Sequence, residues 1–143
     1  MITSDKSIVG PWVAARINGQ FTPENSEAIG LDADGLVAGV IYESWNGASV
    51  VCHIAVDGVM TGAYLAAIFD YPFNRLGVNK IIAPIAESNE KSIKFVQKLG
   101  FRKEAQLLDA HPDGSLFLFT MSREQCKYIG VKYGKKLKPA ACA

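Results

Sequence analysis

The sequence has little of what marks secreted, membrane or metal-binding proteins. Its three cysteines, at positions 52, 126 and 142, are an odd number without metal-ligand spacing, so we expect reduced thiols in a cytosol-like compartment. No stretch approaches the ~20 apolar residues of a membrane span. The opening residues, "MITSDKSIVGPWVAARI", lack the basic and long apolar segments of a signal peptide. These absences together predict a soluble, cytoplasmic protein, without metal.

The chain also lacks an excess of charge of either sign. Lys and Arg number 15 and Asp and Glu number 14, which gives a formal net charge of +1. No global attraction to nucleic acid or to acidic partners is therefore expected. The exception is local: the end of the chain, "KYIGVKYGKKLKPAACA", is rich in lysine. Such a segment is typical of a solvated terminus, and contact with polyanions is the alternative.

What the sequence does have is the composition of one globular domain. Hydrophobic residues make up 49% of the 143 residues and charged residues 20%, which suits a chain that buries a substantial core. We see no linker and no internal repeat. A single domain over residues 1–143 is expected, with a basic tail from about residue 131.

In the first half of the chain, apolar spacing predicts one helix followed by three strands. The helix covers residues 5 to 18, and Pro11 marks either its start or a bend. After a loop, "EAIGLDADG" and "LVAGVIYESWNG" read as strands that end on Asp-Gly and Asn-Gly, both signals of tight hairpins. The third strand is "ASVVCHIAVD". Two tight turns predict an antiparallel meander.

In the second half, helices and strands alternate. A central helix runs from Thr61 to Leu76, kinked at Pro72. The buried strand "NKIIAPIAE" follows, and then a helix over residues 89–99 that ends at a glycine. A hairpin of "RKEAQLLDA" and "SLFLFTMS", joined through "HPDG", and a short helix over residues 123–130 complete the chain. The strand–helix–strand unit demands a right-handed parallel crossover, so we expect a mixed sheet with helices on both faces.

One segment of this second half carries a family resemblance. "APIAESNEKSIKFVQKLGFRKEAQL" resembles the strand–helix–strand signature of the GNAT superfamily of acyl-CoA-dependent N-acyltransferases, in which an Asn opens a helix that ends in Leu-Gly-Phe. "FDYPFNRLGVNKI" is similar to the family's central helix and the strand after it. With "WVAARI", "AIGLDADGLVAGVIY" and "MSREQC", the likeness spans nearly the whole chain and is greatest to small GNAT-like proteins of phages and prophages.

The resemblance implies a fold and a co-substrate. The fold is α+β, an α/β/α sandwich around a mixed, mostly antiparallel sheet with a splayed parallel strand pair and a shortened N-terminal part. Acetyl-CoA would insert its pantetheine arm between "ASVVCHIAVD" and "NKIIAPIAE", against the backbone of Ile54 and Val56. Pro84 lies in the middle of the second of these strands. Either a splayed edge or a bulge accounts for it.

The family's phosphate-binding loop is altered here. GNAT enzymes hold the pyrophosphate on an Arg/Gln-x-x-Gly-x-Gly/Ala turn at the start of the central helix. The matching positions are Val56, Val59 and Thr61. The alternative to a phosphate site is a strand-end turn at Gly58 and a helix cap at Thr61. A shifted loop would instead present the backbone amides of Met60, Thr61, Gly62 and Ala63.

Candidates for general base lie near the expected cleft. His53 and Asp57 are four residues apart and therefore on the same face of a strand. Histidine is a common general base, and the alternative is that His53 is a core histidine. Glu87 follows a strand, where α/β sheets place ligands, or it serves the next helix as an N-terminal charge. The resemblance makes Asn89 a ligand contact, and its position makes it an N-cap; the two roles are compatible.

The family's general acid has no counterpart at its usual position. A Tyr seven residues after the Asn commonly protonates the departing thiolate, and Val96 stands there. Tyr64 and Tyr71 on the central helix are substitutes, or they are packed aromatics.

Two functions follow from these observations. The first is an N-acetyltransferase that moves an acetyl group from acetyl-CoA to an unidentified amine. The second is a catalytically silent GNAT-fold protein, serving as a phage accessory or virion component through contacts with other phage proteins. Exposed strand edges can pair between two copies of the chain, so a homodimer is one possible state. A phage origin would place the protein in the host cytoplasm or the virion.

Overall fold

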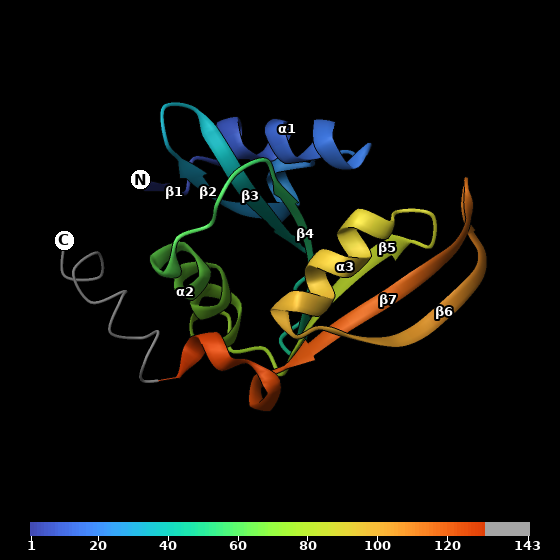
Figure 1. Cartoon of the computed structure of the whole chain (residues 1–143). Coiled ribbons are helices and arrows are strands. Elements are labelled where there is room, and N and C mark those ends of the chain that lie inside the picture. The colour runs from blue at the N-terminus through green and yellow to red at the C-terminus, as the bar shows by residue number, and fades with distance from the viewer. Residues whose placement is uncertain (131–143) are drawn as a thin grey trace.

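In the computed structural model, which describes residues 1–130, seven strands form one sheet (Figure 1). Within the described part, one neighbouring pair of strands is parallel and the others are antiparallel. The basic tail expected from residue 131 lies outside the described residues. In spatial order the strands are β1 (Ile2–Thr3), β2 (Ser26–Asp32), β3 (Leu36–Glu43), β4 (Ser49–Val56), β5 (Lys80–Ala86), β7 (Gly114–Ser122) and β6 (Arg102–His111), with β4 and β5 parallel.

Helices cover both faces of the sheet, as the sequence predicts. Helix α1 (Lys6–Ile17) packs through Val9 and Val13 on Ile41 of β3. Helices α2 (Gly62–Asp70) and α3 (Glu90–Leu99) share a larger core with Val40 and Tyr42. Because neighbouring residues of a strand point to opposite faces, these two cores lie on the two sides of the sheet. The fold is the expected α+β sandwich around a mixed, mostly antiparallel sheet.

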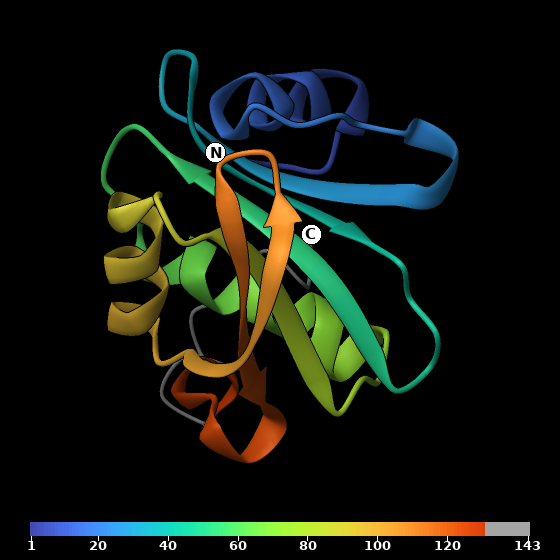
Figure 2. The same ribbon diagram turned by 90° about the vertical axis from the view of Figure 1, so that its right-hand side faces the viewer.

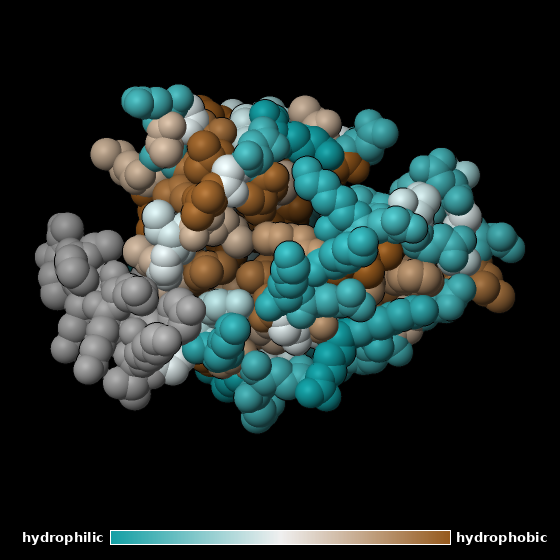
Figure 3. All heavy atoms as spheres, in the orientation of Figure 1, coloured by the Kyte–Doolittle hydropathy of each residue, from teal (hydrophilic) through white to brown (hydrophobic). Residues whose placement is uncertain are grey.

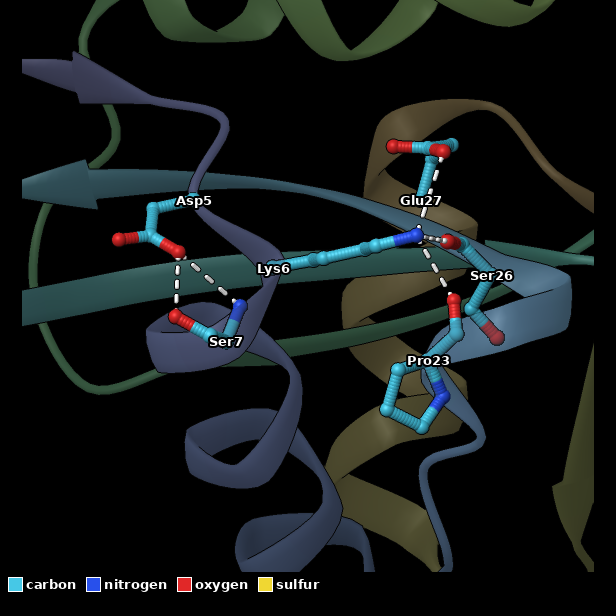
Figure 4. A network of polar contacts seen from close by, with 6 residues as sticks. All are labelled: Asp5, Lys6, Ser7, Pro23, Ser26 and Glu27. Carbon is cyan, nitrogen blue, oxygen red and sulfur yellow. Dashed lines mark hydrogen bonds and ion pairs between the residues drawn. The ribbon is translucent and has the colours of Figure 1, made fainter.

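The start of α1 is tied to the loop before β2 (Figure 4). The Asp5 carboxylate caps the helix by accepting from the Ser7 N–H at 3.1 Å. The Lys6 Nζ donates to the carbonyls of Pro23 at 2.7 Å and Ser26 at 3.1 Å, and lies 3.5 Å from a Glu27 oxygen. The helix continues through Pro11, so of the two alternatives for this residue the helix start is wrong.

The central helix differs from the expected single kinked helix. It is α-helical only to Asp70 and continues as a π-helical turn over Tyr71–Arg75, in which the Leu76 N–H donates to the Tyr71 carbonyl. Pro72 has no N–H to donate to the Ile68 carbonyl four residues earlier. The Tyr42 hydroxyl donates to that carbonyl instead, at 2.5 Å. The proline therefore widens the helix, and a side chain from the sheet satisfies the acceptor that it frees.

The turns agree with the sequence in one case and differ in the other. Asp34 and Gly35 both have positive φ, as a tight hairpin requires. The tight turn expected at Asn46-Gly47 is wrong, because five residues separate β3 from β4. The Asn46 side chain accepts from the N–H groups of Ala48 and Ser49, an Asx turn that closes this longer loop.

Smaller differences lie at the two ends of the described chain. Strand β1 was not expected, and it extends the sheet by pairing with β2. The short final helix is two 3₁₀ turns, Arg123–Gln125 and Lys127–Ile129. No helix within residues 1–130 is both long enough and apolar enough to cross a membrane.

Candidate functional site

The parallel strands β4 and β5 separate halfway along their length. They pair at only three positions, Ser49–Lys80, Val50–Ile81 and Val51–Ile82. Beyond these, β4 remains paired with β3 and β5 remains paired with β7 to their ends. Figure 1 shows β4 and β5 lying together at one end and diverging toward the other, and Figure 2 shows the same sheet from the side where the β6–β7 hairpin faces the viewer. The predicted splay is confirmed.

Backbone polar groups of both strands point into this gap. The Asp57 N–H donates to the Val37 carbonyl at 2.7 Å. Since hydrogen bonding alternates along an antiparallel pair, the N–H and C=O groups of Ile54 and Val56 face β5. On β5, the Glu87 N–H donates to the Ser115 carbonyl on the β7 side. By the same alternation, the backbone nitrogen of Pro84, three residues earlier, faces β4.

Pro84 is therefore explained by the splayed edge. Its register with β7 is regular, without a shift, so the alternative of a bulge is wrong. The missing N–H lies on the side where β5 has no ladder partner beyond Ile82, and proline costs no ladder hydrogen bond there.

Two adjoining cavities, of about 640 and about 560 Å³, extend along the gap. The end of α1 borders them on one side and α3 on the other. The cavities have six wall residues in common, which makes them one continuous cleft: Arg16, Ile17, Ile54, Asn89, Ser92 and Phe95.

His53 lies in the wall of the larger cavity and carries a carboxylate partner. Its Nε2 is 2.8 Å from Oε1 of Glu43, and both side chains are partly exposed. A neutral imidazole that donates from Nε2 keeps Nδ1 as an acceptor, the form that a general base requires. Glu43 was missed from the sequence. It lies two residues from Ile41, the cross-strand partner of His53, so the β3–β4 register was the signal that could have found it.

Asp57 lines the smaller cavity, where its Oδ2 accepts from the Arg16 Nε at 2.8 Å. The Arg16 guanidinium also lies 3.6 Å from the centre of the Trp12 ring. This carboxylate is already paired with a cation, so it is a poorer candidate base than His53.

Glu87 and Tyr64 do not lie in the wall of either cavity. The Glu87 carboxylate accepts from the Ser115 N–H at 3.1 Å and so holds the start of β7. Tyr64 is fully buried, and its hydroxyl donates to the Ile29 carbonyl at 2.8 Å. Burial raises the pKa of Tyr64. The structure does not support either residue as an acid or base of the cleft, since each is engaged elsewhere.

Two polar groups of the expected phosphate loop have partners within the protein. The Thr61 hydroxyl accepts from the Tyr64 N–H at 3.1 Å, which is the helix-cap alternative. The N–H of Gly58 donates to the Val37 carbonyl. The four expected donors, none of which lines the cleft, are Met60, Thr61, Gly62 and Ala63.

Asn89 caps α3 and borders the cleft at once. Its side chain accepts from the Ser92 N–H at 3.2 Å, and the residue lines both cavities. Val96, at the position of the family's tyrosine, is buried in the wall of the larger cavity. His111 and Asp113, from the β6–β7 turn, also line that cavity. The sequence offered no signal for these two, because a turn far along the chain folds back to the cleft.

Comparison with known proteins agrees with this geometry. Residues 43–102, less than half of the chain, match a family model described as an acetyltransferase (GNAT) domain. That segment contains both strands that bound the gap. No curated protein matches the chain.

Solved structures share the fold at low sequence identity. An F149A mutant of the spermidine N-acetyltransferase SpeG from Vibrio cholerae superposes with a TM-score of 0.67 at 12% identity, over 98% of this chain and 99% of that one. The same enzyme in complex with CoA and spermine gives 0.60 at 18% identity, over 72% and 69%. The N-acetyltransferase PseH from Campylobacter jejuni, in complex with acetyl coenzyme A, gives 0.53 at 16% identity, over 69% of each chain. The chain therefore has the fold of the GNAT acetyltransferases, and the strands around its cleft lie within the segment that matches their domain.

Proposed function

We propose that this protein is an N-acetyltransferase that transfers the acetyl group of acetyl-CoA to an amine. The observation that carries the proposal is the gap between β4 and β5, whose backbone groups have no strand partner beyond Val51 and Ile82. SpeG and PseH, which share the fold, have been solved with CoA or acetyl coenzyme A bound.

In this proposal the pantetheine arm enters the gap and hydrogen-bonds to the exposed edge of β4. The N–H and C=O groups of Ile54 and Val56 face that space, and buried backbone groups require a partner of this kind. A β4 amide that donates to the thioester oxygen would stabilise the charge that develops there during transfer. Asn89, in the wall of both cavities, is a further contact for the arm.

His53 is the general base of the proposed reaction, and Glu43 is the residue that orients it. The nitrogen of the neutral amine attacks the thioester carbonyl carbon, the N–C bond forms and the C–S bond breaks. His53 takes the proton that the amine loses, directly or through water. The thiolate of CoA leaves and takes a proton from water, since Val96 occupies the wall where a tyrosine would donate one.

Val96 also favours a second candidate function. A GNAT-fold protein without a general acid can be catalytically silent and act as a phage accessory or virion component through its surface. This alternative shares the fold of the enzyme, and activity separates the two.

The test is a thermal shift with acetyl-CoA, followed by an assay of CoA thiol release with a panel of primary amines, including spermidine. At a hundred times its Kd, a ligand of the folded state stabilises it by about 2.7 kcal/mol. We expect a clear rise in Tm, and release of CoA that depends on an amine. Flat melting curves up to millimolar acetyl-CoA would remove the enzyme hypothesis, whereas binding without release of CoA would favour the silent protein.

A further inference from the structure

Three lysines of α3 form a row along the smaller cavity of the cleft. Lys91, Lys94 and Lys98 all line that cavity. Their spacing of three and four residues puts them on one stripe of the helix, over a length of about 10 Å. The space-filling view shows hydrophilic side chains gathered over α3 (Figure 3).

The row is a cluster of positive charge without a counterion in residues 1–130. All three lysines are exposed, and none of the hydrogen bonds or ion pairs described above involves them. The other charged residues of the cavity wall are Arg16 and Asp57, which pair with each other at 2.8 Å. The cavity therefore carries an excess of unpaired cations, and it continues into the gap beside Ile54 and Val56.

We propose that this lysine row binds the phosphate groups of acyl-CoA, in place of the loop before α2. The inference rests on the proposed function, since it assumes that acetyl-CoA occupies the gap. A thioester arm that lies against β4 in the gap leads, at its nucleotide end, into the cavity that the lysines line. Lysine binds phosphate as a mobile point charge and needs no preformed loop.

Part of the loop before α2 is already hydrogen-bonded within the protein. The N–H groups of Asp57 and Gly58 both donate to the Val37 carbonyl. The Thr61 hydroxyl is used as the cap of α2. Val56 stands at the position of the family's Arg or Gln, so the loop offers no cationic or amide side chain there. The lysine row supplies the charge that the loop lacks.

The test compares two ligands that differ in their phosphates, acetyl-CoA and S-acetylpantetheine, by titration calorimetry. The test variant replaces Lys91, Lys94 and Lys98 by Gln. The control, Arg75→Gln, removes one exposed cation that pairs with Asp70 at 3.5 Å and lines neither cavity of the cleft. We expect the triple variant to bind acetyl-CoA about tenfold or more weakly, by the size of exposed ion pairs.

The same variant should bind S-acetylpantetheine as the wild type does, and its deficit for acetyl-CoA should shrink in about 1 M salt, where exposed charges are screened. Arg75→Gln should match the wild type with both ligands. Equal affinity of the triple variant for acetyl-CoA would overturn the inference and leave the proposed function intact. An equal loss for both ligands would also overturn it, and failure of the wild type to bind acetyl-CoA would remove both proposals.

Discussion

Single side chains decide whether this cleft can do chemistry. Val96 is buried in the wall of the larger cavity, at the position where GNAT acyltransferases commonly carry a tyrosine. We expect Val96→Tyr to raise kcat, because a phenol at this place can protonate the departing thiolate. Steady-state release of CoA thiol measures the change.

The matched control for this change is Val96→Phe, which adds the same ring without the hydroxyl. Both substitutions overfill a packed position and should cost about 1–3 kcal/mol of stability, which urea unfolding measures. If the two variants turn over at the same rate, the missing acid is not what limits the reaction.

His53 provides the second prediction at this scale. His53→Gln keeps a polar side chain but cannot take up a proton, so kcat should fall by about 10²–10⁴-fold, the usual contribution of a general base. The melting temperature should change little, since the side chain is partly exposed. Glu43→Gln, which leaves His53 in place but weakens its orientation, should lower kcat less. Full activity of His53→Gln would assign the base elsewhere in the cleft.

At the scale of elements, the central helix depends on a contact from the sheet. Pro72 frees the Ile68 carbonyl, and the Tyr42 hydroxyl donates to it at 2.5 Å in the core. Tyr42→Phe removes the donor and leaves a buried acceptor unpaired, so the free energy of unfolding should fall by about 1–3 kcal/mol. Urea unfolding measures this, with Tyr71→Phe as the control on a half-buried tyrosine. Loss of equal size in both variants would contradict the role given to Tyr42.

Elements set by local chemistry were predictable from the sequence, and those set by cross-strand geometry were not. Asn89 and Gly100 predict the two ends of α3, and both are the cap residues in the structure. Pro84 marked a place without a ladder hydrogen bond, because a missing N–H is a local property, but it left a splayed edge and a bulge as alternatives. The sequence analysis missed that Glu43 reaches His53, because their contact depends on the β3–β4 register and the turn expected to set that register, Asn46-Gly47, is not tight. For Tyr64 the structure agrees with the packed-aromatic alternative. The sequence left both alternatives open because helical spacing defines a stripe but does not tell which stripe faces a cleft.

For the molecule as a whole, a buried cysteine thiol and a buried tyrosine hydroxyl predict a loss of stability at high pH. Burial raises the pKa of the Cys52 thiol from 9.0 to about 12, and it also raises the pKa of Tyr42. A group whose pKa is higher in the folded state stabilises the fold below its unfolded pKa and loses that effect as the pH rises. The free energy of unfolding should therefore decline from about pH 9 to about pH 12.

Cys52→Ala should flatten this decline, whatever its effect on stability at neutral pH. Cys126→Ala is the comparison, because backbone hydrogen bonds from Tyr128 and Ile129 oppose the rise that burial causes in the pKa of Cys126. Urea unfolding at several pH values measures both slopes. Identical slopes in the wild type and in Cys52→Ala would contradict the assignment to this thiol.

The three residue pairs between β4 and β5 also determine how firmly the two halves of the sheet are held together. The strands β1 to β4 and the strands β5 to β7 form two parts of the sheet that pair with each other at only one end of the gap. A ligand in the gap would be held between two strands whose relative position is fixed by pairs such as Ser49–Lys80, outside the gap. The ligand's own contacts with both strands would join the two parts of the sheet more firmly, so we expect amide hydrogen exchange in both parts to slow together when it binds.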